Sequence, residues 1–177
     1  MILTIAVRIF TAVGSNQTQG SASANPIVGA ARGEYQRVKE YLLKSAEQMP
    51  DSDYGFKPTP TVRSFGEIVA HVASTQFVFC AAAQNQKNPQ TADLENTQKA
   101  KGPLVDVLRA SFAYCDSAYE MKDSQALGKI TLPNWDEQSA LSVLILNVAH
   151  NNEHYGNIVT YFRLRGLVPP SSQPARK

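Results

Sequence analysis

The segment Leu144-Ile-Leu-Asn-Val-Ala-His150-Asn-Asn-Glu-His154-Tyr-Gly-Asn-Ile-Val-Thr-Tyr161 is an apolar helical pattern that carries two histidines four residues apart. In an α-helix, four residues advance by about 6 Å and overshoot one turn by about 40°, so the two imidazoles lie on one face. A single cation can then contact both. The third histidine of the chain, His71, lies in a separate helical pattern. We therefore predict that His71, His150 and His154 converge on one metal ion.

Projected as a helix, this segment has a polar stripe beside an apolar one. The polar stripe spans an arc of about 80° and contains Asn147, His150, His154, Asn157 and Tyr161, with Asn151 near the interior boundary. We expect Asn147, Asn151, Asn157 and Tyr161 to orient the histidines through hydrogen bonds. Glu153 points away from the stripe and is a weaker candidate for catalysis. The sequence assigns no catalytic residue.

Helical periodicity recurs three more times along the chain. Asn25-Pro26 reads as an N-cap with proline at the first helical position, and that helix continues to about Met49. Ser64-Phe-Gly-Glu67 is a capping box that opens a helix ending near Ala83, with His71 at the edge of its apolar stripe. Gly102-Pro103 opens the third helix, which continues to about Tyr119.

The last helix is expected to begin at the capping-box-like segment Asn134-Trp-Asp-Glu137 and to end near Arg165, before Gly166. The polar stretch from Gln84 to about Lys101 is long enough to cross the bundle or to cover one end of it. No convincing strand alternation and no internal repeat is found. The sequence therefore predicts an all-α four-helix bundle.

Composition limits the function classes. At 177 residues, with 43% hydrophobic and 18% charged residues, the chain fits one globular domain. The formal net charge is only +2, and the basic residues form no run, so nucleic acid is not an expected partner. Apolar residues near the start of the chain are too few to span a bilayer and are interrupted by Arg8, so no stable membrane insertion is expected.

The amino-terminal segment leaves the location of the protein open. Residues 1–24 form either a disordered tail or a weak export signal, because Ala22-Ser-Ala24 has the form of a signal-peptidase site. The protein is therefore expected to be either cytoplasmic or exported. The domain is expected to comprise residues 25–172, followed by a tail at 173–177.

The two cysteines, Cys80 and Cys115, have no metal-site spacing. They are expected to be either buried thiols or a single disulfide that joins two helices. If bonded, they would close a loop of about 36 residues and stabilise the fold by about 3 to 4 kcal/mol.

Three histidine ligands would leave coordination positions open for water or substrate, as catalytic metal sites do. Neutral imidazole suits zinc, nickel, copper and iron. A bound ion could acidify water to a pKa of about 7, or polarise a substrate oxygen or sulfur. The alternative is that the histidines are ordinary, partly buried hydrogen-bonding residues, since a pair four residues apart also arises by chance. The position of all three histidines at the interior edges of helices favours the metal.

The segments around the histidines resemble the DinB/YfiT-like family of metal-binding four-helix bundles. The resemblance rests on Arg63-Ser-Phe-Gly-Glu-Ile-Val-Ala-His71-Val-Ala, on His150 to Pro170, and on Tyr54-Gly-Phe-Lys-Pro-Thr-Pro60. It covers about residues 26–172. It implies a divalent metal, nickel or zinc, held by one histidine of the second helix and two of the last.

The resemblance also implies a reaction class, because relatives of that family include bacillithiol S-transferases and mycothiol-dependent maleylpyruvate isomerases. A thiol S-transferase that acts on a small-molecule substrate with a low-molecular-weight thiol is the leading hypothesis. The alternatives are a metal-dependent hydrolase and a non-enzymatic, metal-stabilised binding or dimerisation module. A homodimer is expected both from the family and from the apolar residues Val143 and Leu146, which extend beyond one bundle face.

Overall fold

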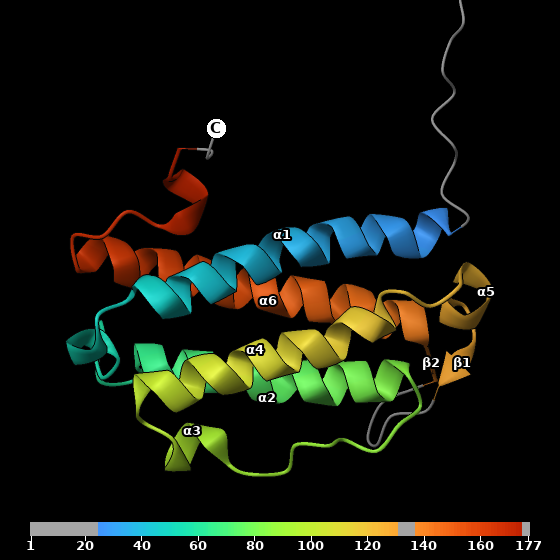
Figure 1. Cartoon of the computed structure of the whole chain (residues 1–177), viewed down its shortest axis with the longest axis horizontal. Coiled ribbons are helices and arrows are strands. Elements are labelled where there is room, and N and C mark those ends of the chain that lie inside the picture. The colour runs from blue at the N-terminus through green and yellow to red at the C-terminus, as the bar shows by residue number, and fades with distance from the viewer. Residues whose placement is uncertain (1–24, 131–136, 175–177) are drawn as a thin grey trace, which may run out of the picture.

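Four long helices form a bundle in the computed structural model, which describes residues 25–130 and 137–174 (Figure 1). The long helices are α1 (Pro26–Gln48), α2 (Phe65–Ala83), α4 (Lys101–Ala118) and α6 (Ala140–Leu164). The shorter elements are η1 (Asp51–Asp53), α3 (Leu94–Thr97), α5 (Asp123–Ala126), β1 (Lys129–Ile130), β2 (Gln138–Ser139) and η2 (Pro170–Ser172). The predicted all-α four-helix bundle is confirmed.

The direction of the helices explains the long polar connection. Figure 1 shows α1 and α6 running one way and α2 and α4 running the other way. Because α2 and α4 are parallel, the chain must return along the bundle between them, and it does so through residues 84–100. The short helix α3 lies in this connection and contacts α2. Of the two routes predicted for the connection, the structure has the one that crosses the bundle.

Helix starts depend on local capping in one case and on a distant residue in another. At α2 the predicted capping box is present: the Glu67 amide donates to Ser64 Oγ at 3.2 Å, and the Ser64 amide donates to Glu67 Oε2 at 2.8 Å. Asn25 lies at the N-cap position of α1 and Pro26 at its first position, as predicted, but the Asn25 side chain makes no capping hydrogen bond. Instead, the Asp123 carboxylate accepts from the amides of Ile27 and Val28 at 3.1 and 2.9 Å.

The predicted start of the last helix is wrong. Helix α6 begins at Ala140, and Ser139 caps it by accepting a hydrogen bond from the Ser142 amide at 3.0 Å. The preceding residues of β2 pair antiparallel with β1. This pairing was not predicted, because two residues are too few to give an alternating pattern. Of the segment 134–137, only Glu137 lies within the described residues. The predicted end of the helix is confirmed, since α6 ends at Leu164 and Gly166 follows with φ +72°.

The core lies between the four long helices. Its largest fully buried side chains are Tyr35, Tyr119, Phe65, Phe112, Phe162, Leu42, Met49, Leu104, Leu108, Leu144, Ile158 and Gln76. Within the described ranges, α2 alone is long and apolar enough to cross a membrane, but most of it is buried in the bundle. Val143 is buried in the single chain and needs no second copy to cover it. Dimerisation therefore stays a prediction.

A disulfide between Cys80 of α2 and Cys115 of α4 joins the two parallel helices, with 5.3 Å between the Cα atoms. Both cysteines are fully buried. Of the two alternatives for the cysteines, the structure therefore has the disulfide. The expected tail or signal segment, residues 1–24, and the end of the expected C-terminal tail, residues 175–177, lie outside the described part of the chain.

Candidate metal centre

The structure brings the three histidines together between α2 and α6. His150 Nε2 lies 3.1 Å from His71 Nε2 and 3.1 Å from His154 Nε2. The three candidate ligand atoms all lie within 4.8 Å of one another. Two nitrogens bound to one tetrahedral zinc, each at about 2.0 to 2.1 Å, would lie about 3.3 Å apart. The spacing of His150 to each of the other two histidines is therefore close to what a single ion requires.

A carboxylate that the sequence did not predict supports His71 from outside. Glu95 Oε1 lies 2.6 Å from His71 Nδ1, and Arg63 Nε donates to Glu95 Oε2 at 2.8 Å. Glu95 is on α3, in the connection that crosses the bundle. With Nδ1–H donated to the carboxylate, His71 is the tautomer whose Nε2 lone pair is available to a metal.

His150 has a similar but weaker support. Its Nδ1 lies 3.5 Å from Thr75 Oγ1, while the Thr75 hydroxyl donates to the His71 carbonyl at 2.9 Å. The Phe79 ring packs edge-on against the His150 imidazole, with ring centroids 5.5 Å apart. The Nδ1 atom of His154 is buried and has no hydrogen-bond partner among the described residues. In two of the three histidines, then, Nδ1 points toward an oxygen and Nε2 points into the cluster.

The electrostatics favour neutral imidazoles, which are the form that binds metal. Burial, followed by the nearby His154, His71 and Arg63 charges, lowers the pKa of His150 to about 4. Burial and the charge of His71 also lower the pKa of His154. Partial burial opposes ionisation of Glu95, but its hydrogen bonds with Arg63 and His71 outweigh this and lower the pKa of the carboxyl. Convergent lone-pair donors with an ionised carboxylate behind one of them fit a divalent cation.

The four residues expected to orient the histidines divide into two groups. Asn147 and Asn151 are fully buried and make hydrogen bonds to other buried polar groups. Asn147 donates to Tyr119 Oη at 3.1 Å, and Asn151 donates to Gln76 Oε1 at 3.3 Å. Asn157 is exposed, and the Tyr161 hydroxyl donates to the Arg63 carbonyl. Among the described residues, no hydrogen bond joins Asn147, Asn157 or Tyr161 to a histidine, so their orienting role stays a prediction.

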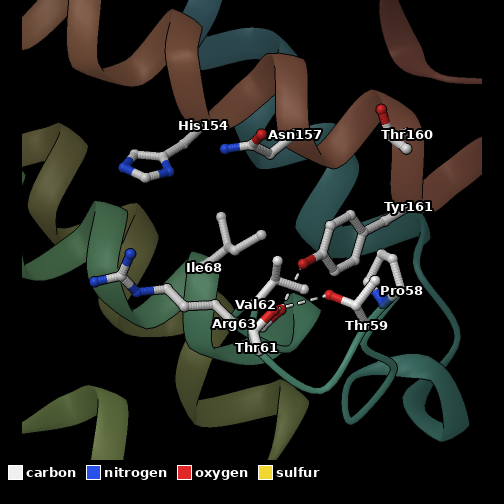
Figure 2. Close-up of a pocket in the computed structure, with 10 residues that line it drawn as sticks. All are labelled: Pro58, Thr59, Thr61, Val62, Arg63, Ile68, His154, Asn157, Thr160 and Tyr161. Carbon is white, nitrogen blue, oxygen red and sulfur yellow. Dashed lines mark hydrogen bonds between the residues drawn. The ribbon is translucent and has the colours of Figure 1, made fainter.

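Asn157 and Tyr161 instead line a pocket that opens beside the histidines. Its volume is about 660 Å³, which is within the usual range for small-molecule sites. The lining residues are Pro58, Thr59, Thr61, Val62, Arg63, Ile68, His154, Asn157, Thr160 and Tyr161. Figure 2 shows that they come from the segment before α2, from α2 itself and from α6. A ligand in this pocket would contact His154 directly.

Glu95 and Thr75 were missed for different reasons. Glu95 lies in a polar connection without periodicity. It reaches His71 only because this connection runs back along α2. Thr75 follows His71 by four residues, so helical spacing alone could have placed its hydroxyl one turn away. Glu67, which lies one turn before His71, is used in the capping box and in ion pairs with Lys57 and Lys99, as its capping position suggested.

Comparison with known proteins agrees with the fold. The family model described as the DinB superfamily matches residues 34–158. A DinB-like protein from Bacillus cereus has a TM-score of 0.70 at 15% identity, covering 80% of this chain and 95% of its own. A DinB-like protein from Bacillus subtilis has a TM-score of 0.63 at 21% identity, covering 85% and 100%.

A mycothiol-dependent maleylpyruvate isomerase is also similar, with a TM-score of 0.58 at 12% identity, covering 82% of this chain and 78% of its own. No curated protein matches the sequence. At these identities, the structural similarities establish the fold alone.

Proposed function

The chain belongs to the DinB superfamily, and on that premise we propose that it is a divalent-metal-dependent enzyme whose metal is held by His71, His150 and His154. The observation that carries the proposal is the convergence of three imidazole nitrogens beside a pocket of about 660 Å³. Nickel or zinc suits this donor set. Three protein ligands leave room for a ligand from the pocket, as in catalytic sites.

The reaction we propose first is thiol transfer of the S-transferase type. When bound, the metal would lower the pKa of a small thiol and hold it as a thiolate. The residues of the chain supply the rest: Glu95 holds His71 in its metal-binding tautomer, and the pocket receives the electrophile next to His154. The thiol-dependent isomerase among the structural neighbours supports this class of chemistry without identifying the substrate.

Metal-dependent hydrolysis is the second candidate, and the disulfide favours it. Disulfides such as Cys80–Cys115 are typical of oxidising compartments, whereas low-molecular-weight thiols are kept reduced in the cytosol. In an exported protein, water would be the more accessible nucleophile. Both candidates use the same three histidines and the same pocket.

One experiment separates these functions. The protein is loaded with zinc or with nickel and assayed against an electrophile panel with several small thiols, and in parallel against esters and amides. Turnover that requires a thiol supports the transferase, and turnover without a thiol supports the hydrolase. His154→Ala should abolish either activity. A flat result in both panels with every metal would contradict an enzymatic role and favour a non-enzymatic, metal-stabilised binding module.

A further inference from the structure

The pocket beside the histidines has one charged side chain among its lining residues. That side chain is Arg63, and among the residues that the structure describes no aspartate or glutamate lines the pocket. The remaining lining residues are neutral, and five of them carry hydroxyl or amide groups: Thr59, Thr61, Asn157, Thr160 and Tyr161. A ligand that enters this space therefore meets a positive charge and hydrogen-bonding groups.

Arg63 is held in place from two sides. Its Nε atom donates to Glu95 Oε2 at 2.8 Å, and its carbonyl accepts a hydrogen bond from the Tyr161 hydroxyl. Because Glu95 also contacts His71 at 2.6 Å, the guanidinium is positioned relative to a histidine of the cluster through one shared carboxylate. An arginine fixed in this way loses less side-chain entropy when it binds a ligand.

The edge of Arg63 that recognises carboxylates is available. The Glu95 contact uses Nε, and within the described residues no hydrogen bond or ion pair of the two terminal nitrogens is found. The side chain is 44% exposed. Figure 2 shows the guanidinium at the same end of the pocket as the His154 imidazole, whereas Pro58, Thr59 and Thr160 lie at the other end. Two parallel N–H donors match a carboxylate in a bidentate pair.

We propose that this pocket binds a small carboxylate-bearing ligand, with the carboxylate paired to the terminal nitrogens of Arg63 and the remainder of the molecule extending along the pocket past His154. This inference rests on the proposed function and narrows it, since it gives the substrate, or the thiol that reacts with it, a carboxylate. Arg63 is then a specificity residue.

The test compares benzoate with its neutral isostere benzamide as probes, using titration calorimetry on the zinc-loaded protein. Wild type should bind benzoate at least about tenfold more tightly than benzamide, the effect of a charge-assisted bidentate pair. Arg63→Gln should reduce this preference to less than about twofold, and Arg63→Lys should retain part of it. Lys99→Gln is the matched control: it removes a positive charge that pairs with Glu67 but does not line the pocket, and it should leave the preference unchanged.

Two results would overturn the inference. One is an equal affinity of wild type for both probes. The other is a benzoate preference that persists in Arg63→Gln, because the carboxylate would then bind the metal alone. Repeating the titrations on protein stripped of metal keeps this test separate from the proposed function. If stripped protein still prefers benzoate and the preference depends on Arg63, the carboxylate subsite is supported even if the metal proposal fails. If Arg63→Gln loses the preference for benzoate but binds zinc normally, an indirect effect through His71 is excluded.

Discussion

Replacing Glu95 by glutamine tests whether the crossing connection supports the metal centre. In the wild type, His71 Nδ1 lies 2.6 Å from Glu95 Oε1. Glu95→Gln keeps one oxygen that can accept this hydrogen bond, but it removes the negative charge. The second oxygen becomes an amide nitrogen, which cannot accept the hydrogen bond that Arg63 Nε makes at 2.8 Å. The variant should therefore weaken the hold on His71 without emptying any space in the core.

The expected loss can be stated as a range. Removing a partner of a metal-binding histidine costs about ten- to hundredfold in metal affinity, or about 1.4 to 2.7 kcal/mol. The Glu95 side chain is 29% exposed, so water screens part of its charge, and we expect the lower half of that range. Helix content should not change, because Glu95 lies on a four-residue helix outside the core.

Competition titration of zinc against a chromophoric chelator at neutral pH measures this effect. Glu47→Gln is the matched control, since Glu47 also pairs with an arginine, Arg109, at 2.8 Å, but lies on α1 away from the histidines. Its zinc affinity should equal that of wild type. An unchanged affinity in Glu95→Gln, or an equal loss in both variants, would refute the role assigned to Glu95.

Three further predictions concern stability and are all measured by urea unfolding. The hydrogen bond from the Ser64 amide, followed by the one from Lys57, lowers the pKa of Glu67 from 4.5 to about 2. Glu67→Gln should therefore be less stable than wild type at pH 7, and the difference in unfolding free energy should shrink as the pH falls from about 4.5 to 2. A difference that stays constant over this pH range would contradict the prediction. Replacing both Cys80 and Cys115 by alanine, which opens a loop of sequence separation 35, should lower the unfolding free energy by about 3 to 4 kcal/mol, and no loss would contradict a stabilising disulfide. Asp123→Ala should lower the unfolding free energy by about 0.5 to 2 kcal/mol, because the first amides of α1 lose their acceptor. Asp123→Asn should lower it less, since the amide oxygen can still accept a hydrogen bond. Equal losses in the two variants would argue against capping by Asp123.

Features with local causes could be predicted from the sequence. The capping box at Ser64 and Glu67 joins residues three apart, so its hydrogen bonds need only the first turn of α2. The spacing of His150 and His154 likewise fixes a shared helix face. His150 and His154 lie beside His71 because α2 packs against α6. The position of His71 at the edge of an apolar stripe was enough to predict that it faces another helix.

Features that depend on distant segments could not be predicted. Asn25 holds the predicted N-cap position of α1, yet the first free amides of the helix donate to Asp123, which comes from a different part of the chain. Glu95 reaches His71 only because α2 and α4 are parallel and the connection must return between them. Helical projection also placed Asn157 on the same face as the histidines, but it could not indicate that this side chain would be exposed in a pocket rather than covered by a neighbouring helix.

Elemental analysis of the protein purified without chelator tests the central claim most directly. Wild type should contain about one divalent metal ion per chain. His150→Ala and His154→Ala should each lose it while keeping nearly the same helix content, since both positions lie at the edge of the core, where truncation costs less than at its centre. Absence of stoichiometric metal from wild type, together with no binding of added zinc or nickel, would contradict the three-histidine metal centre.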